Sequence, residues 1–511
     1  MIKRSLTIFI CIFILAFPTT VVAAVPYRSY VQVFYDDDHW EQLGAPAAFV
    51  PQREYDFATV GGLRWPSDIH STPDGTRLFV VDTGNNRIIE CHYTLVPLRI
   101  LDSFDYNGET HTFNEPQGVF YNEHTGLLYV ADTRNGRIVS FDNNFNAVRI
   151  LGAPEIPLPE GMYTFEYLPS KLVIDRGGRM YVIAGGFNRG IIELCPEGEF
   201  VGFFGAPTVE VSGWQRFLRV FMSAEQRRRM INFVPTEFDN FHINDDGFIF
   251  TASTRQMAQV ISALSDNIQV PEDLLPIMKL NARGTNVLRY DDFPPLGDLF
   301  FGVLTQFIDV MYIGNGMMAA LDSNMGRIFV YDGDGQFLYM FGGGSAPWQA
   351  RGSQLGTFTS AIALDRIGDT FFVLDAGTST VTSFIPTEYG AAVERSAIAF
   401  FNGDLDAAYA AWAEILTINS NYHQAIEGIA RILVHRGYYR EALDMFRSIN
   451  SNGSHASMAF SNLRKQTILD AAPLIFVSLL VLIVVFVAFK FAKLYRHLKK
   501  EAWEWQQRRT T

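Results

Sequence analysis

Cysteine is nearly absent from this chain. Only three cysteines occur among its 511 residues, and Cys11 lies in an N-terminal segment that we expect to be removed. Cys91 and Cys195 remain, in repeat units that are not neighbours, whereas a disulfide requires Cα atoms within about 7 Å of each other. We therefore expect both to be unpaired core residues, and the sequence excludes a small fold held together by disulfides.

Positive charge is also scarce. The chain carries 41 Lys and Arg against 54 Asp and Glu, a formal net charge of −13. Because the first four residues carry +2 and the residues after 489 carry +5, residues 25–489 hold about −20 by subtraction. A surface this acidic repels a phosphate backbone, so nucleic acid is not an expected partner. No Ser/His/Asp signature, phosphate-binding loop or paired-cysteine metal motif occurs in the sequence, and no cofactor is expected.

Two apolar runs lie near the ends of the chain. The first, residues 6–17, follows Lys3 and Arg4 and precedes Val22-Ala23-Ala24. This is the order of a basic region, an apolar region and a small-residue cleavage site. We predict a signal peptide over residues 1–24.

The second apolar run, residues 471–489, is long enough to cross a bilayer as a helix. The residues after it are rich in Lys and Arg, which mark the cytoplasmic side of a membrane span. We predict a transmembrane helix over residues 467–492 and a basic cytoplasmic tail over residues 493–511. The protein is then a single-pass type I protein of the cell membrane, with its N-terminal bulk outside the cytoplasm.

A short motif recurs three times between these runs. In each copy an apolar strand ends in Asp and is followed by a four-residue turn, an Arg and a second apolar strand. The three pairs are Asp82 and Arg87, Asp132 and Arg137, and Asp322 and Arg327. An Asp and an Arg on the two sides of a turn can pair and cover the edge of the sheet. Because catalysis does not need the same residue in several units, we assign these residues a structural role.

Six units of about 50 residues can be followed from Pro66 to Phe384. Each holds short alternating strands separated by Gly, Asn and Asp turns, and four-stranded units repeated around an axis form a β-propeller. The sequence therefore predicts a mainly β fold, a six-bladed β-propeller over residues 25–390. A strand from the lead-in Pro46–Pro51 is expected to join the last blade, since an open ring would leave a bare strand edge.

The motifs Pro66…Asp82-Thr-Gly-Asn-Asn-Arg87 and Pro116…Asp132-Thr-Arg-Asn-Gly-Arg137 resemble those of the NHL-repeat family of six-bladed propellers. The resemblance extends over about residues 45–390. Units 1 and 2 match well, unit 5 matches fairly well, and units 3, 4 and 6 match loosely. Unit 6 has Thr380 in place of the Arg, and unit 4 lacks both the Asp and the Arg.

A helical segment interrupts the propeller between units 3 and 4. Apolar residues at helical spacing begin at Trp214, and a capping-box pattern at residues 223–226 opens a second helix that carries Arg227, Arg228 and Arg229. We predict a helical insert over about residues 212–233. Three arginines on an acidic ectodomain raise the hypothesis of a docking surface for a partner, but we prefer the alternative of a solvated helix that pairs with local acids.

After residue 390 the pattern becomes helical again. Three kinds of residue recur at a spacing of 34, namely Gly403 and Gly437, Ala408 and Ala442, and Trp412 and Phe446. This spacing resembles tetratricopeptide repeats. We predict TPR-like helical hairpins over residues 391–466, with a polar link at residues 452–457 leading to the membrane span.

Two histidines occupy similar positions in the predicted first strands of units 1 and 4. These strands line the central channel, and His70 and His242 come from blades on opposite sides of the ring. The family resemblance brings metal chemistry into question, because some NHL-type propellers are metal-dependent lyases and other six-bladed propellers are calcium lactonases. A zinc site needs three or four ligands, but Phe120, Val173 and Met311 fill the comparable positions. We interpret the histidines as ordinary strand residues and keep them as metal candidates only.

Two functions remain open. The first is a membrane-anchored extracytoplasmic scaffold that binds a protein, peptide or glycan through a propeller face and the TPR-like helices, and contacts the bilayer through residues 471–489. Similarity to bacterial proteins suggests a place beside a membrane transport system. The alternative is a metal-dependent lactonase- or lyase-like enzyme with its site in the channel. Three or more His, Asp or Glu side chains around one point of the channel would favour the enzyme. An apolar or mixed channel with a broad polar rim would favour the scaffold, which is the function that we expect.

Overall fold

The chain divides into two compact units in a computed structural model. The structure describes residues 25–157 except 28, 37 and 38, together with residues 166–185, 190–205, 238–254, 275–288, 297, 305–343, 354–449, 451 and 454–510. The first unit holds residues up to Gln32 and residues Gln42–Tyr422, and the second holds Val33–Glu41 and His423–Thr511. The predicted signal peptide (1–24) and helical insert (212–233) lie outside the described residues.

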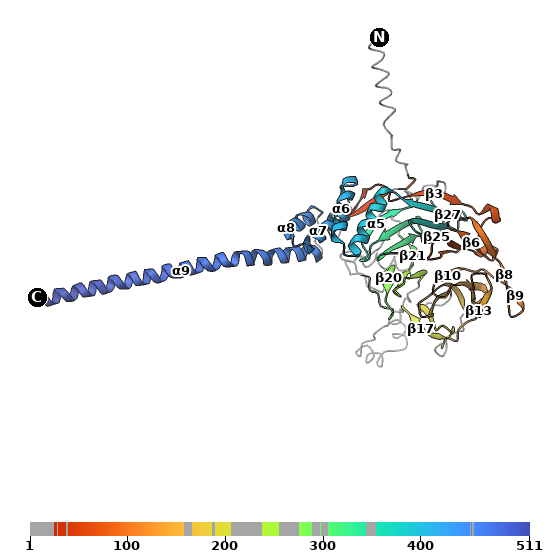
Figure 1. Ribbon diagram of the computed structural model, residues 1–511, viewed down its shortest axis with the longest axis horizontal. Coiled ribbons are helices and arrows are strands. Elements are labelled where there is room, and N and C mark those ends of the chain that lie inside the picture. Colours follow the sequence, from red (N-terminus) through yellow and green to blue (C-terminus); the bar gives the residue numbers. More distant parts are fainter. Residues whose placement is uncertain are drawn as a thin grey trace, which may run out of the picture. The chain divides into compact units, whose positions relative to one another are not determined.

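The first unit contains a six-bladed β-propeller, as the sequence predicts (Figure 1). Blades 1 to 3 are antiparallel sheets whose strands follow one another in chain order. Blade 1 consists of β4 (Asp68–Ser71), β5 (Arg77–Asp82), β6 (Arg87–His92) and β7 (Pro97–Leu101). Blade 2 consists of β10 (Gly118–Asn122), β11 (Leu127–Asp132), β12 (Arg137–Phe141) and β13 (Ala147–Leu151). Blade 3 consists of β14 (Leu168–Ile174), β15 (Met180–Gly185), β16 (Ile191–Leu194) and β17 (Phe200–Phe204).

Blades 4 to 6 complete the ring. Blade 4 consists of β18 (Asn240–Ile243), β19 (Ile249–Ala252) and β20 (Ile277–Leu280). A backbone bridge between Leu280 and Asn286 marks the start of its expected fourth strand, of which residues 286–288 are described. Blade 5 consists of β21 (Phe307–Gly314), β22 (Met317–Asp322), β23 (Arg327–Tyr331) and β24 (Phe337–Phe341). Blade 6 consists of β25 (Ala361–Ile367), β26 (Thr370–Asp375), β27 (Thr380–Pro386) and β3 (Phe49–Tyr55).

The first strands of the blades surround the propeller axis. Each of these six strands contacts the first strands of both neighbouring blades, and β25 of the last blade contacts β4 of the first. Apolar side chains of adjacent blades pack against each other, in clusters that join blades 1 and 2, blades 2 to 4, blades 4 and 5, and blades 6 and 1. The strands are therefore covered on both faces, which explains their nearly continuous apolar sequences.

The ring is closed by the N-terminal strand, as predicted. β3 pairs antiparallel with β27, with Tyr55 opposite Val381 and Phe49 opposite Pro386. The last blade is therefore built from both ends of the propeller sequence. Opening the ring requires the loss of this strand pair and would expose an unpaired edge.

The repeated Asp and Arg residues form ion pairs across the turn between the second and third strands. The N···O distances are 2.7 Å for Asp82 and Arg87, 2.7 Å for Asp132 and Arg137, and 2.9 Å for Asp322 and Arg327. The three carboxylates are fully buried. Their second oxygens accept backbone hydrogen bonds from the segments that lead into the same blades, donated by Arg64, Asn114 and Gln306 at 2.7, 2.8 and 3.0 Å. Each Asp thus holds the start of its blade against the turn.

Two hairpins lie outside the predicted pattern of six units. β1 (Tyr30–Asp36) pairs with β2 (His39–Gly44), and β8 (Ser103–Tyr106) pairs with β9 (Glu109–Thr112) between blades 1 and 2. Both cysteines beyond the signal segment are free, as expected, but only Cys91 is fully buried, because Cys195 lies in a turn and is partly exposed.

The 34-residue repeat corresponds to two helical hairpins. α5 (Glu388–Phe401) and α6 (Leu405–Ile418) belong to the first unit, and α7 (His423–His435) and α8 (Tyr439–Ser448) belong to the second. Gly403 and Gly437 follow the first helix of each hairpin with φ of 75° and 82°, values that favour glycine. The other residues of the repeat are buried, as close packing between helices requires. In the first unit, the buried Glu394 of α5 accepts hydrogen bonds from Tyr339 and Arg366 at 2.5 and 2.8 Å, which attach α5 to blades 5 and 6.

A single long helix, α9 (Ser454–Thr510), ends the described chain. It contains the predicted membrane-spanning run, and within the described residues it alone is long and apolar enough to cross a membrane. The predicted polar link at residues 452–457 needs correction, because α9 begins at Ser454 and residues 455–457 form part of its first turn. From Ser454 onward, the chain therefore runs as one helix into the apolar run.

Candidate ligand pocket at the channel mouth

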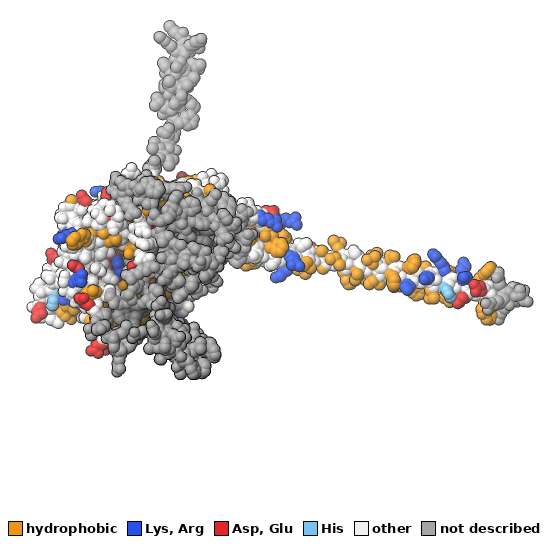
Figure 2. Space-filling view, turned by 180° about the vertical axis from the view of Figure 1, so that it is seen from behind, with side chains coloured by type: hydrophobic (Ala, Val, Ile, Leu, Met, Phe, Trp, Pro, Cys, Tyr) orange, Lys and Arg blue, Asp and Glu red, His pale blue; other side chains and the backbone are white. Residues whose placement is uncertain are grey.

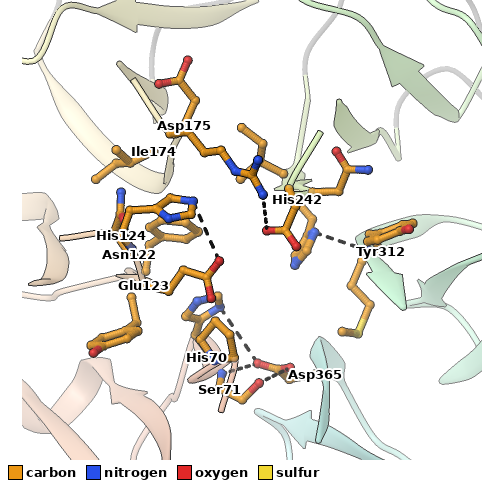
Figure 3. Close-up of a pocket in the computed structure, with 18 of the residues that line it drawn as sticks. His70, Ser71, Asn122, Glu123, His124, Ile174, Asp175, His242, Tyr312 and Asp365 are labelled. Carbon is orange, nitrogen blue, oxygen red and sulfur yellow. Dashed lines mark hydrogen bonds and ion pairs between the residues drawn. The ribbon is translucent and has the colours of Figure 1, made fainter. Parts of the chain in front are cut away.

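A cavity of about 250 Å³ opens where the first strands of the propeller end (Figure 3). All six blades contribute to it, through residues within the segments 70–73, 120–124, 174–176, 242–245, 311–312 and 365–366. These segments are the ends of β4, β10, β14, β18, β21 and β25 and the turns that follow them. We call this cavity the channel-mouth pocket. Its place on the axis follows from the ring of first strands.

The pocket brings together the two histidines selected from the sequence. His70 and His242 come from opposite blades, as expected, and both line the same cavity. Burial lowers the pKa of His70 to about 4 and that of His242 to about 3, and the nearby His70 contributes to the second shift. Both rings are therefore neutral near pH 7. Nδ1 of His242 accepts a hydrogen bond from the backbone N–H of Tyr312 at 3.4 Å, which leaves its proton on Nε2.

A buried carboxyl group lies beside His70. Asp365 Oδ2 is 4.0 Å from His70 Nδ1, and Asp365 Oδ1 accepts a hydrogen bond from the Ser71 hydroxyl at 2.9 Å. Burial raises the pKa of Asp365 to about 7, although the bonds from Ser71 oppose this shift. A neutral imidazole next to a carboxyl that titrates near neutrality can exchange protons with a bound ligand. Asp365 was not selected from the sequence, because it is followed by Arg366 in β25 and resembles any other charged residue of a strand.

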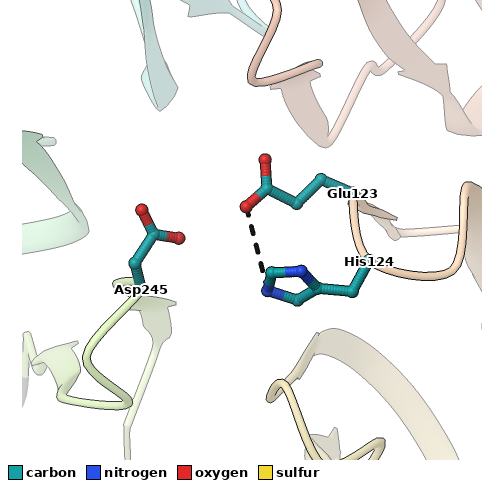
Figure 4. Close-up of side chains that lie close together, drawn as sticks. All are labelled: Glu123, His124 and Asp245. Carbon is teal, nitrogen blue, oxygen red and sulfur yellow. Dashed lines mark ion pairs between the residues drawn. The ribbon is translucent and has the colours of Figure 1, made fainter.

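Three further groups meet at the rim of the pocket (Figure 4). The metal-binding atoms of Glu123, His124 and Asp245 all lie within 4.8 Å of one another. Glu123 Oε1 is 3.8 Å from His124 Nε2, and Asp245 Oδ1 is 4.0 Å from the guanidinium of Arg176. All three side chains are exposed. This group was not selected from the sequence either, because its members lie in the turns of blades 2 and 4 rather than at strand positions.

These residues fit a divalent metal ion in part. Two carboxylates and an imidazole supply three ligands, the number that a catalytic metal site takes from the protein. The fit is limited by Arg176, since its guanidinium offers Asp245 an alternative partner. His70 and His242 are not members of this group, so the two predicted metal candidates lie in the pocket but apart from the three converging ligands.

A second layer of polar side chains crosses the channel, further from the mouth in the same first strands. Lys171 Nζ lies 2.5 Å from Asp68 Oδ1, and Asn240 Nδ2 donates to Asp309 Oδ1 at 2.6 Å. The remaining oxygens of the two aspartates accept backbone hydrogen bonds from Val119 at 3.0 Å and Leu364 at 2.7 Å. These contacts join blades 1 to 3 through Asp68 and blades 4 to 6 through Asp309.

Burial changes the ionisation of the polar layer. It raises the pKa of Asp309 to about 7, against the effect of Lys171, and it also raises the pKa of Asp68. The positive charge of Lys171 lies near both Asp68 and Asp309, so it limits the rise in the pKa of each carboxyl. The side chains of this layer bond to one another and do not line the pocket.

The other residues selected from the sequence lie elsewhere. The repeated Asp and Arg residues lie at the turns between second and third strands and do not line the pocket. Trp214, Arg227, Arg228 and Arg229 lie outside the described residues. Phe120 and Met311 line the pocket, in agreement with their expected inward positions, whereas Val173 does not and its neighbour Ile174 does.

No protein-family model matches the chain, and no curated protein matches it. Solved structures with similar folds have low identity. A virginiamycin B lyase from Staphylococcus aureus is 8% identical over 66% of this chain and 99% of its own, with a TM-score of 0.39. Hydrazine synthase from Kuenenia stuttgartiensis is 12% identical over 64% of this chain and 96% of its own, with a TM-score of 0.35. A protein of unknown function from Bacteroides thetaiotaomicron is 9% identical over 70% of this chain and 76% of its own, with a TM-score of 0.39. These similarities transfer no residue and no activity to this chain.

Proposed function

We propose that the protein is a membrane-anchored extracytoplasmic binding protein whose propeller holds a polar group of a protein, peptide or glycan partner in the channel-mouth pocket. The observation that supports this most directly is a cavity on the axis with polar and aromatic contributions from all six blades. The domain plan is an NHL-type propeller, TPR-like hairpins over residues 391–466 and a type I anchor at residues 467–492.

The size and lining of the pocket favour a single ligand group. Pockets for drug-sized molecules typically measure at least about 300 Å³, so a cavity of about 250 Å³ suits one side chain or one sugar ring of a larger partner. Neutral imidazoles offer both donors and acceptors, and Phe120, Tyr121 and Tyr312 provide aromatic surface on which a ring can stack. The rest of the partner, which does not fit inside the pocket, would then contact its rim.

Partner selection also involves surfaces beyond the pocket. We include in the proposal a docking role for Trp214 and for Arg227, Arg228 and Arg229, and a place beside a membrane transport system. A pull-down from detergent-solubilised membranes tests this role by comparing the wild type with a variant in which the three arginines are changed to Glu. Unchanged partners would remove the docking surface from the proposal while leaving the pocket.

The binding role is tested with the full chain in lipid nanodiscs on glycan and peptide arrays. His242→Gln removes an imidazole from the pocket, and His92→Gln is the matched control, because His92 lies on β6 away from the pocket. We expect at least a tenfold loss of affinity for the captured ligand in the first variant and none in the second. Equal binding by both variants and the wild type would place the ligand site outside the pocket.

A metal-dependent enzyme, lactonase- or lyase-like, is the second candidate. The convergence of Glu123, His124 and Asp245 at one rim meets the condition that the sequence analysis set for an enzyme. We place the enzyme second because all three side chains are exposed and Arg176 offers Asp245 another partner. In this alternative the three residues would bind the metal ion, and Asp365 or His70 would act as the general acid or base that transfers a proton to or from the substrate. Metal analysis of purified wild type and His124→Ala, with His92→Ala as control, tests it. A stoichiometric metal lost only in His124→Ala would favour the enzyme, and no metal in either would exclude this site.

A further inference from the structure

The part of α9 beyond the apolar run has two different faces. In an α-helix each residue is rotated by about 100° from the previous one, so Phe491, Leu494 and Leu498 fall on one side. Lys493, Arg496 and Lys500 fall on the opposite side. The three apolar side chains are 68%, 55% and 53% exposed. Residues 490–505 thus form a basic amphipathic helix, which we call the tail helix.

The tail helix continues directly from the stretch that is proposed to cross the bilayer. Figure 2 shows hydrophobic side chains along α9, with Lys and Arg gathered toward its C-terminal part. Five basic residues stand against Glu501 and Glu504 between residues 490 and 505, a formal charge of about +3. Since no linker separates the tail helix from the apolar run, its first turns are held within reach of the lipid headgroups.

We propose that the tail helix bends onto an anionic lipid surface, with its apolar face between the acyl chains and its basic face against the headgroups. This proposal rests on the membrane anchoring proposed above and adds a defined partner for the tail. Charge complementarity favours lipid, because cytoplasmic leaflets carry anionic headgroups and each nearby Lys or Arg strengthens the attraction. The composition agrees, since an interfacial helix combines Lys and Arg on one face with aromatic and Leu residues on the other.

The competing occupant of the apolar face is the tail helix of a second copy of this chain. Two such helices could pair through Phe491, Leu494 and Leu498 while remaining upright. The charges argue against this arrangement, because it would bring two chains of about +3 together without a counter-charge. The two cases differ in their dependence on lipid charge and on protein density, which an experiment can separate.

The experiment places the full chain in nanodiscs of phosphatidylcholine alone or with about one third phosphatidylglycerol. Cleavage after Glu501 and Glu504 by a glutamate-specific protease reports access to the tail helix. We expect cleavage to be about tenfold slower in anionic discs and the protection to vanish at about 1 M salt, where the screening length falls to about 3 Å. Lys493→Gln/Arg496→Gln should abolish the protection, whereas Arg464→Gln/Lys465→Gln, on the other side of the apolar run, should retain it.

Each other result overturns the proposal. Equal cleavage in neutral and anionic discs would show that lipid charge does not hold the tail. Protection that ignores lipid charge but rises with the number of chains per disc would assign the apolar face to a second copy. A chain that does not stay with the discs at all would refute the proposed anchor itself, and this outcome is separated from the others by flotation before protease is added.

Discussion

Replacing Lys171 with Met should destabilise the propeller strongly and in a pH-dependent way. Lys171 Nζ lies 2.5 Å from Asp68 Oδ1 and also donates to the backbone carbonyl of Ser67 at 3.3 Å. The substitution keeps the volume and the apolar stem but removes the cation of the polar layer. Breaking a buried ion pair by removing one partner costs about 3–5 kcal/mol, because the other charge stays buried without compensation.

The pH dependence follows from the carboxyls that Lys171 faces. The folded-state pKa of Asp309 is about 7, far above the usual value of an unfolded chain, so the folded state binds more protons between about pH 4 and pH 7. The free energy of unfolding therefore falls as the pH rises through this window. Without Lys171 the pKa values of Asp309 and Asp68 rise further, so the free energy of unfolding decreases more steeply as the pH rises. We expect a loss of about 4 kcal/mol at about pH 8 and about 2 kcal/mol or less at about pH 5.

Urea unfolding of the full chain in detergent, followed by circular dichroism of the β signal at the two pH values, measures this difference. Arg179→Met is the matched control, because Arg179 is an exposed residue just before β15 that pairs with Asp175 at 2.8 Å and Glu193 at 3.3 Å. Exposed pairs contribute about 1 kcal/mol or less. An equal loss at both pH values in Lys171→Met would show that packing, not charge, holds the layer, and the reasoning would be wrong.

Three further predictions concern local contacts. Gly390→Ala should lower the free energy of unfolding by more than 2 kcal/mol, on the order of an overpacked core, because the added Cβ would lie 2.0 Å from the carbonyl oxygen of Ala48, just before β3. Thermal unfolding measures this loss, and an unchanged stability would contradict the close contact between Gly390 and Ala48. Cys91 should react with maleimide much more slowly than Cys195 by peptide mass mapping, since burial raises its thiol pKa to about 12; comparable rates would refute the buried position. Asp132→Asn should cost about 1–3 kcal/mol by urea unfolding, since it weakens a buried ion pair and a backbone tether; an unchanged midpoint would show that the repeated Asp has no stabilising role.

The sequence predicted the architecture well because its evidence is local and repeated. Strand, turn and strand recur at about 50-residue intervals, and each copy gives an independent indication of the same blade. The closing strand could also be predicted, since a ring of sheets leaves one unpaired edge. The hairpin β8–β9 was missed because it breaks the repeat without a comparable copy elsewhere.

The candidate site could be predicted only in part. His70 and His242 were selected because they occupy matching strand positions, but their meeting in one pocket depends on the width of the channel. His124 and Asp245 come from turns of different blades, and nothing local connects them. Asp365 looks in the sequence like any acidic residue, and its unusual pKa arises only from burial against the first blade.

The amino-acid sequence by itself therefore determined the blade count, the strand pattern, the pairing of Asp with Arg across each turn and the apolar run near the C-terminus, because all of these depend on residues close together in the chain. Tertiary structure alone decided which polar groups face one another across the axis, and hence which are neutral and which are paired. The physical reason is that ionisation and ligand geometry depend on distances of a few ångströms and on burial, and ring closure sets both by joining blades that are distant in the sequence.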